Sequence, residues 1–311
     1  LIALYHQVFA TKDLIVVFQT FKISLTYEGL PWLILAIALM PVNWFFETLK
    51  WRQFTQLFSK MSVWESLRAV LAGVAVSLFT PNRIGEYGGR ILLTEQRHSW
   101  RIVVATLLGS FSQMIVLFSM GLAGFLWFSY NHLGLKTYLL FVIGVAGFLF
   151  VLTLAIAFFR IQAIIFLINW LVGNQIWRRI RKQIIVLRMC TDHQKWQAIG
   201  WAMLRYMTYS LQYWLLLEFL GIHLPVLAAF AAIATIFLIQ TGVPLPPAGA
   251  FFARAEIALF VWGSLGANEI SILAATFGLF IINLALPALL GSIFLVKMNG
   301  GKLSGYEKHA V

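Results

Sequence analysis

The chain has 311 residues, of which 61% are hydrophobic and 11% are charged, and its formal net charge is +12. Soluble domains average about 45–50% apolar and about 25% charged residues, so this composition excludes an ordinary water-soluble protein, and its low charge density excludes disorder. The basic residues fall in loops between apolar stretches, so the net charge does not indicate nucleic acid as a partner. The class that remains is an all-α polytopic integral membrane protein.

Five apolar stretches are long enough to cross about 30 Å of hydrocarbon as helices. They are residues 30–49, 102–130, 137–159, 196–220 and 269–296. The fourth stretch also carries Arg205 and Glu218. We therefore predict a bundle of membrane-spanning helices.

Two further apolar stretches are interrupted by proline and glycine. Residues 66–79 run into the segment from Thr80 to Glu86, and residues 225–240 run into the Pro-rich segment from Gly242 to Gly249. Proline removes a backbone donor, and a broken backbone at membrane depth must be surrounded by protein or water. We predict two re-entrant helix hairpins, at 66–92 and 225–263.

The distribution of basic residues supports this topology. If the loop after residue 49 is cytoplasmic, only three of the 23 lysines and arginines lie on the outer side of the membrane: Lys12, Lys22 and Lys136. Three more, Arg83, Arg205 and Arg254, stay at membrane depth, and all the others are cytoplasmic. A full crossing by either hairpin would swap the sides of all later loops. We expect a cell (inner, cytoplasmic) membrane protein with basic loops and the C-terminus in the cytoplasm.

The whole chain, 1–311, is predicted to be a single transmembrane domain with two halves. Interrupted segments at matching places indicate an inverted repeat of about 1–159 and 196–297, with a site near the bilayer midplane. Residues 161–195 form a basic, amphipathic cytoplasmic segment, which either lies on anionic headgroups or only fixes the orientation.

Charged residues at membrane depth mark the candidate site, because each costs about 2.5–3.5 kcal/mol at the centre of a helix. The first group is Arg83, Glu86 and Arg90, which share one face of a helix. The second group is Arg254 and Glu256, which diverge on a helix and need partners elsewhere. We predict that Arg83 lies near Glu256 and that Arg254 lies near Glu86.

These groups have two interpretations. Buried Arg–Glu pairs can simply hold a bundle together. Alternatively, three arginines exceed two glutamates, which leaves a guanidinium for an anion such as phosphate. Helix N-termini after Pro81 and Pro247 would add positive dipole ends at the same depth.

Other polar residues have weaker signals. Arg205 and Tyr209, with two further tyrosines, form a stripe that either lines a headgroup cavity or lets Arg205 reach the interface. Glu47 and Lys50 are interpreted as an interfacial pair at the end of a span. Four amides are expected to form interhelical hydrogen bonds: Asn43, Gln113, Gln240 and Asn283.

Signatures of catalysis and of metal binding are absent from the sequence. There is no nucleophile elbow, no phosphate-binding Walker loop and no zinc-protease motif. The single cysteine, Cys190, and the six histidines form no ligand spacing. We expect no enzymatic activity, no metal and no cofactor.

The chain resembles the lysylphosphatidylglycerol synthase transmembrane family, also called flippase-like domain proteins, over nearly its whole length. The family's first motif is close to P-x-R-x-G-E with a following arginine, which Pro81 to Glu86 and Arg90 match. Its second motif resembles P-x-G-x-G-x-R-E, which Pro247-Ala248-Gly249 and Arg254-Ala255-Glu256 match loosely, with altered spacing.

The resemblance implies a membrane domain that moves a lipid headgroup between leaflets. Bifunctional members carry a cytosolic aminoacyl-transferase domain, which we expect this chain to lack. Arg83 and Arg254 would meet the headgroup phosphate, and Glu86 and Glu256 would position them or engage an amino headgroup. The lipid could be a phospholipid, aminoacylated phosphatidylglycerol or a polyprenyl-phosphate-linked sugar, moved downhill or with an ion.

Two alternatives stay open. The protein could be a lipid-binding scaffold or accessory subunit for a separate lipid synthase or glycosyltransferase. It could also be a membrane transferase that uses Glu86 or Glu256 as a base. The sequence leaves the oligomeric state open.

Overall fold

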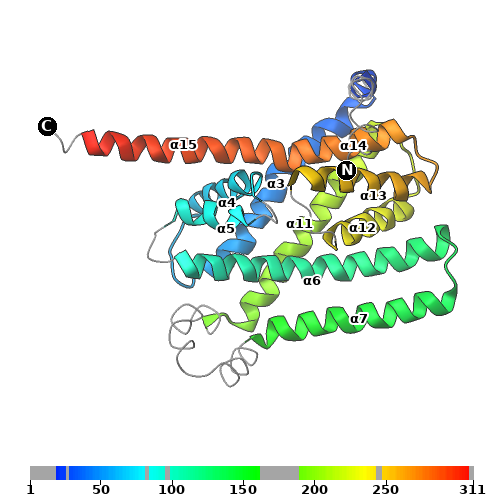
Figure 1. The fold of residues 1–311 in the computed structure, drawn as a ribbon, viewed down its shortest axis with the longest axis horizontal. Helices are drawn as coiled ribbons and strands as arrows, with labels where there is room; N and C mark the ends of the chain where they lie inside the picture. The colour runs from blue at the N-terminus through cyan, green and yellow to red at the C-terminus, as the bar shows by residue number, and fades with distance from the viewer. Residues whose placement is uncertain are drawn as a thin grey trace. The chain divides into compact units, whose positions relative to one another are not determined.

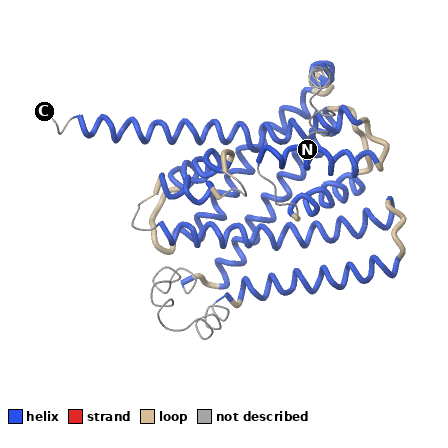
Figure 2. Tube along the Cα trace, viewed as in Figure 1, coloured by secondary structure: helices blue, strands red, loops and turns tan. Residues whose placement is uncertain are grey.

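A computed structural model describes residues 19–25, 28–80, 84–94, 99–161, 189–242 and 247–307. Within these residues every regular element is a helix (Figures 1 and 2). The helices are α3 (Leu30–Thr55), α4 (Val63–Ser77), α5 (Gly85–Leu92), α6 (Ser99–His132), α7 (Thr137–Phe159), α11 (Asp192–Phe219), α12 (Val226–Thr241), α13 (Pro247–Gly263), α14 (Glu269–Phe280) and α15 (Leu286–Glu307). A π-helical turn, η3 (Ile281–Ala285), joins the last two without a break.

The predicted class, an all-α polytopic membrane protein, is confirmed. Four helical stretches of the described chain are long and apolar enough to cross a bilayer: α3, α6, α7 and the continuous run Glu269–Lys297. Helix α11 covers the fifth predicted span but is not among the four. It is less apolar because it carries charged residues along its length, including Arg205 and Glu218.

The chain divides into two compact units. Unit 1 draws on Leu1–Asn43, Ile115–Thr153 and Arg205–Asn283. Unit 2 draws on Trp44–Met114, Leu154–Leu204 and Leu284–Val311. Each unit takes segments from both predicted halves of the sequence, so the units are not those halves. The inverted repeat stays a prediction.

In unit 2 the two short helices α4 and α5 lie against each other (Figure 1). A capping box between Ser62 and Glu65 begins α4, and the N–H of Gly85 at the start of α5 donates to Thr80 Oγ1 at 2.7 Å. The close approach depends on Gly89, where a Cβ atom would collide with the backbone of Ala72. The prediction of two helices separated by the Pro81 segment is therefore confirmed on either side of it.

In unit 1 the corresponding pair is α12 and α13, which pack against each other, and α13 also packs on α14. A small residue also sets the distance between α6 and α12, because a Cβ at Gly124 of α6 would collide with Ala234 of α12. Whether either helix pair re-enters the membrane stays a prediction. Most of the predicted basic segment, 162–188, lies outside the described residues.

Replacing Gly89 by alanine should destabilise unit 2, because the new methyl group meets backbone that cannot rotate away. We expect a loss on the order of 1–3 kcal/mol, typical of overpacking. The matched control is Gly88→Ala, since Gly88 is exposed on the same helix and its Cβ would meet no atom within 4 Å. Thermal unfolding in detergent should show a lower Tm for Gly89→Ala alone; equal Tm values would contradict this packing.

Cysteine labelling can test the first re-entrant hairpin, because the native thiol of Cys190 should contribute little labelling of its own. Cys190 is 3% exposed, and burial raises the pKa of its thiol to about 11, so it should react slowly with maleimides at neutral pH. Lys60→Cys and Trp100→Cys, both at exposed positions flanking the hairpin, should react with an impermeant maleimide from the same side. Labelling from opposite sides would mean that the segment crosses once.

Candidate functional site

Unit 2 contains a buried ionic cluster centred on Arg90 of α5. The Nη2 atom of Arg90 lies 3.0 Å from Glu47 Oε1 of α3 and also contacts Glu86 Oε1, one turn earlier on α5. The second oxygen of Glu47 lies 2.5 Å from Lys50 Nζ. Two cations therefore face two carboxylates, and the cluster is electrically balanced.

The protein surrounds this cluster closely. The Arg90 guanidinium lies over the ring of Trp51, 5.2 Å from its centroid, and the Trp51 indole N–H donates to Thr106 Oγ1 at 3.0 Å. Lys50 Nζ also donates to Gln113 Oε1 at 3.1 Å. The side chains of Arg90 and Lys50 are 1% and 2% exposed. The cluster thus joins α3, α5 and α6 inside one unit.

This arrangement changes the interpretation of three predicted residues. Glu47 and Lys50 do pair, as predicted, and the pair is buried together with Arg90. Arg90, which the charge distribution assigns to the cytoplasmic side, is buried inside unit 2, and its side of the membrane stays a prediction. For Arg90 or Glu86 to bind substrate, an existing ion pair would have to break, which is costly in a dry site.

Two predicted amide contacts are also present. Asn43 Nδ2 donates to Asn283 Oδ1 at 2.7 Å in unit 1, and Gln113 additionally donates to the carbonyl of Ala202 at 3.4 Å in unit 2. These three amides bridge helices as predicted. Gln240 instead lies at a pocket.

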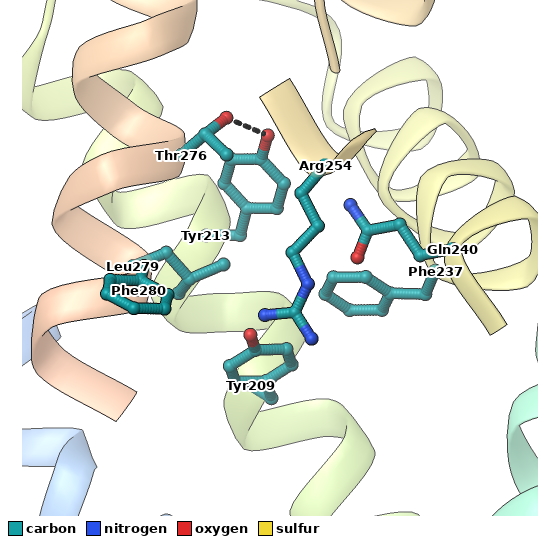
Figure 3. A pocket seen from close by; sticks show the side chains of 8 residues that line it. All are labelled: Tyr209, Tyr213, Phe237, Gln240, Arg254, Thr276, Leu279 and Phe280. Atoms are coloured by element: carbon teal, nitrogen blue, oxygen red, sulfur yellow. Dashed lines mark hydrogen bonds between the residues drawn. The ribbon is translucent and has the colours of Figure 1, made fainter. Parts of the chain in front are cut away.

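Unit 1 contains that pocket, which four helices build. Figure 3 shows the Arg254 side chain extending from α13 between Tyr213 of α11 and Phe237 of α12, with its guanidinium turned toward Tyr209. The lining residues that the structure describes are Tyr209, Tyr213, Phe237, Gln240, Arg254, Thr276, Leu279 and Phe280. Among these described residues, Arg254 is the only charged one.

The walls of the pocket are held by ring stacking and by one hydrogen-bond chain. The Phe237 ring stacks on Tyr209 with centroids 5.0 Å apart, and on Tyr213 at 6.2 Å. The hydroxyl of Tyr213 pairs with Thr276 Oγ1 at 3.0 Å (Figure 3). The same hydroxyl accepts the indole N–H of Trp262 at 3.0 Å. Two residues of the predicted stripe on α11, Tyr209 and Tyr213, therefore line a pocket.

Arg254 differs from Arg90 in its electrostatic environment. It is half-buried, and it forms no ion pair with any residue that the structure describes. Glu256, two residues further along α13, is exposed and does not line the pocket. Arg205 is half-buried and does not line it either. Of the predicted site residues, only Arg254 and Tyr209 meet here.

The remaining site predictions are untested. Arg83 lies outside the described residues, so its predicted proximity to Glu256 stays a prediction. The predicted pairing of Arg254 with Glu86 joins residues of different units and also stays a prediction. Within unit 2, Glu86 already has Arg90 as its partner.

One comparison with known proteins gives a match for this chain, and two give none. The family model described as the lysylphosphatidylglycerol synthase TM region matches residues 5–291 of the chain. The chain belongs to this family. A search of curated proteins and a search of solved structures each found no match. Membership in the lysylphosphatidylglycerol synthase TM family assigns the protein a role connected with membrane lipids.

Several residues that build the two sites in this family member were not predicted as functional. Trp51 carries the cation–π contact to Arg90, but nothing in the sequence around it indicates this contact. Phe237 and Thr276 sit in uniformly apolar helices, where periodicity cannot single out one face. Tyr209 and Tyr213 did carry a signal, because polar hydroxyls recur on one face of α11.

Arg90→Ala should destabilise the protein by about 3–5 kcal/mol, because it removes the cation that the buried Glu47 and the half-buried Glu86 share. Thermal unfolding in detergent measures the loss, and Arg160→Ala, at an exposed position, is the control for removing a cation. Equal Tm values for the two variants would show that the cluster does not support the fold.

Proposed function

We propose that the protein moves a lipid with a phosphate-bearing headgroup between membrane leaflets. The observation that carries the proposal is Arg254, a cation without an ion-pair partner among the described residues, in an aromatic-lined pocket of a lipid-related membrane domain. A guanidinium in a low-dielectric environment is costly unless an anion meets it. Its planar fork suits the oxygens of phosphate.

The lining of the pocket supports binding more than chemistry. Its described residues include no carboxylate, histidine or cysteine that could serve as a base or a nucleophile near neutral pH. The polar groups beside Arg254 are an amide and hydroxyls. We therefore infer that the protein is not an enzyme and that it needs no cofactor or metal.

The pocket as observed is small. Its cavity volume is about 10 Å³, which is close to the space that one water molecule requires. A headgroup can enter only if the side chains or helices around Arg254 move apart. A site that opens and closes around its ligand would expose a headgroup to the two leaflets in turn.

The buried cluster of unit 2 would then have a supporting role. Glu47 and Glu86 neutralise Arg90, so this arginine is not available to a phosphate without breaking ion pairs. The substrate would be a phospholipid of the cell membrane whose acyl chains remain in the bilayer. A separate synthase would supply it if it is a modified lipid.

Leaflet exchange of labelled phosphatidylglycerol in reconstituted vesicles tests the proposal. Arg254→Ala should slow the exchange by about 10- to 100-fold, because charged hydrogen bonds of roughly 1.5–3 kcal/mol are lost. Arg254→Lys should retain part of the activity because it keeps the charge but loses the fork. Lys136→Ala removes a cation from the exposed α6–α7 connection and should leave the rate unchanged.

Two results would contradict the proposal. If folded Arg254→Ala exchanges phosphatidylglycerol between leaflets at the wild-type rate, the pocket has no part in the transport. Lipid that copurifies stoichiometrically with the wild type but never changes leaflet would instead identify a lipid-binding accessory protein.

A further inference from the structure

We propose that the Arg254 pocket selects a lipid headgroup in which phosphate is the only formal charge, and that it disfavours headgroups that also carry an ammonium group. The inference rests on the proposed function, because it names the substrate class of the same pocket. It predicts phosphatidylglycerol or another polyol phosphate as the substrate class, and it excludes an aminoacylated lipid.

The charge balance of the pocket is the first argument. Arg254 contributes one positive charge, and the described residues that line the pocket contribute no negative charge. The sequence from Gln240 to Arg254 contains no aspartate or glutamate. Binding one phosphate diester brings the pocket to neutrality, whereas a headgroup that adds ammonium groups restores an uncompensated positive charge.

The aromatic residues do not supply a substitute site for a cation. An ammonium group can bind over the face of an aromatic ring. Here Phe237 is stacked on both Tyr209 and Tyr213, and the Arg254 guanidinium lies beside the Tyr209 ring (Figure 3). A second cation in the same space would be repelled by the first.

Uncharged hydrogen-bonding groups fit the remainder of a polyol headgroup. The Tyr213 hydroxyl is already used by Thr276 and Trp262. The Tyr209 hydroxyl and the Gln240 amide lie at the pocket and form no hydrogen bond with any residue that the structure describes. An amide and a phenol can each donate and accept, which matches the hydroxyl groups of glycerol or a sugar.

A lipid fits the pocket better than a free phosphate. Leu279, Phe280 and Phe237 give the lining a large apolar share, and all of it lies in a membrane domain. Inorganic phosphate would gain nothing from these side chains. Apolar contacts beside a charged anchor are what an acylated glycerophosphate would use.

The experiment is a binding measurement on the full chain in detergent, independent of transport. Native mass spectrometry would compare phosphatidylglycerol, phosphatidylethanolamine and lysyl-phosphatidylglycerol at equal concentrations. We expect each ammonium-bearing lipid to bind about tenfold or more weakly than phosphatidylglycerol. Glycerol phosphate and inorganic phosphate, added as competitors, should displace phosphatidylglycerol only at far higher concentration.

Gln240→Glu is the decisive variant, because it adds a carboxylate beside Arg254 with little change in volume. It should weaken the binding of phosphatidylglycerol. It should also reduce or reverse the ratio of the affinity for phosphatidylglycerol to that for lysyl-phosphatidylglycerol. Gln197→Glu is the matched control, because it makes the same charge change at an exposed position in unit 2 and should leave the order of the three lipids unchanged.

The outcomes separate this inference from the proposed function. Equal binding of all three lipids by the wild type, or a preference for lysyl-phosphatidylglycerol, overturns the selectivity while leaving transport intact. If free glycerol phosphate displaces phosphatidylglycerol at a concentration equal to that of the lipid, the phosphate that binds in the pocket need not belong to a lipid, and that part of the inference is overturned. Selective binding of phosphatidylglycerol without leaflet exchange supports the inference and overturns the proposed function.

Discussion

The high cost of an unpaired charge in hydrocarbon governs the polar chemistry of this protein. Arg90 meets that constraint internally, because Glu47 and Glu86 share its guanidinium and Trp51 covers it. Arg254 has no described carboxylate to neutralise it and is surrounded mainly by aromatic and neutral polar groups. The same residue type is therefore neutralised by two carboxylates in one unit and has no described carboxylate partner in the other.

Small residues provide the second constraint, because the ionic cluster forms only if its helices approach closely. Gly89 brings α5 onto α4, which places Arg90 where α3 can reach it. Helix association in lipid lacks the hydrophobic driving force that operates in water, so close packing and polar contacts must supply the specificity. In unit 2 close packing at Gly89 and polar contacts at Arg90 act at adjacent positions of the short helix α5.

The sequence predicted the class, the long apolar helices and the breaks after residues 79 and 240, because hydrophobicity and proline act locally. It also predicted the bridging amides, since an amide inside an apolar span needs a partner. It could not predict that Glu47 turns inward to Arg90, because that contact joins residues far apart in the chain. Phe237 and Thr276 were missed since every face of their helices is apolar.

The π-helical turn Ile281–Ala285 carries a consequence for tolerance to insertion and deletion. A π turn holds one residue more than an α turn, and each residue advances an α-helix by about 100°. A π turn therefore takes up one extra residue in nearly the same rotation that an α turn completes with one fewer. Removing one residue from this turn would restore α geometry and leave the following stretch nearly in phase, so Gly291 would keep its close approach to Leu71, where no Cβ fits. Removing one residue after the turn, before Gly291, would instead rotate this glycine by about 100° away from Leu71, whereas Thr276, before the turn, would keep its hydrogen bond to Tyr213. The helix should therefore tolerate a one-residue deletion within its π turn better than one in the α-helical stretch that follows.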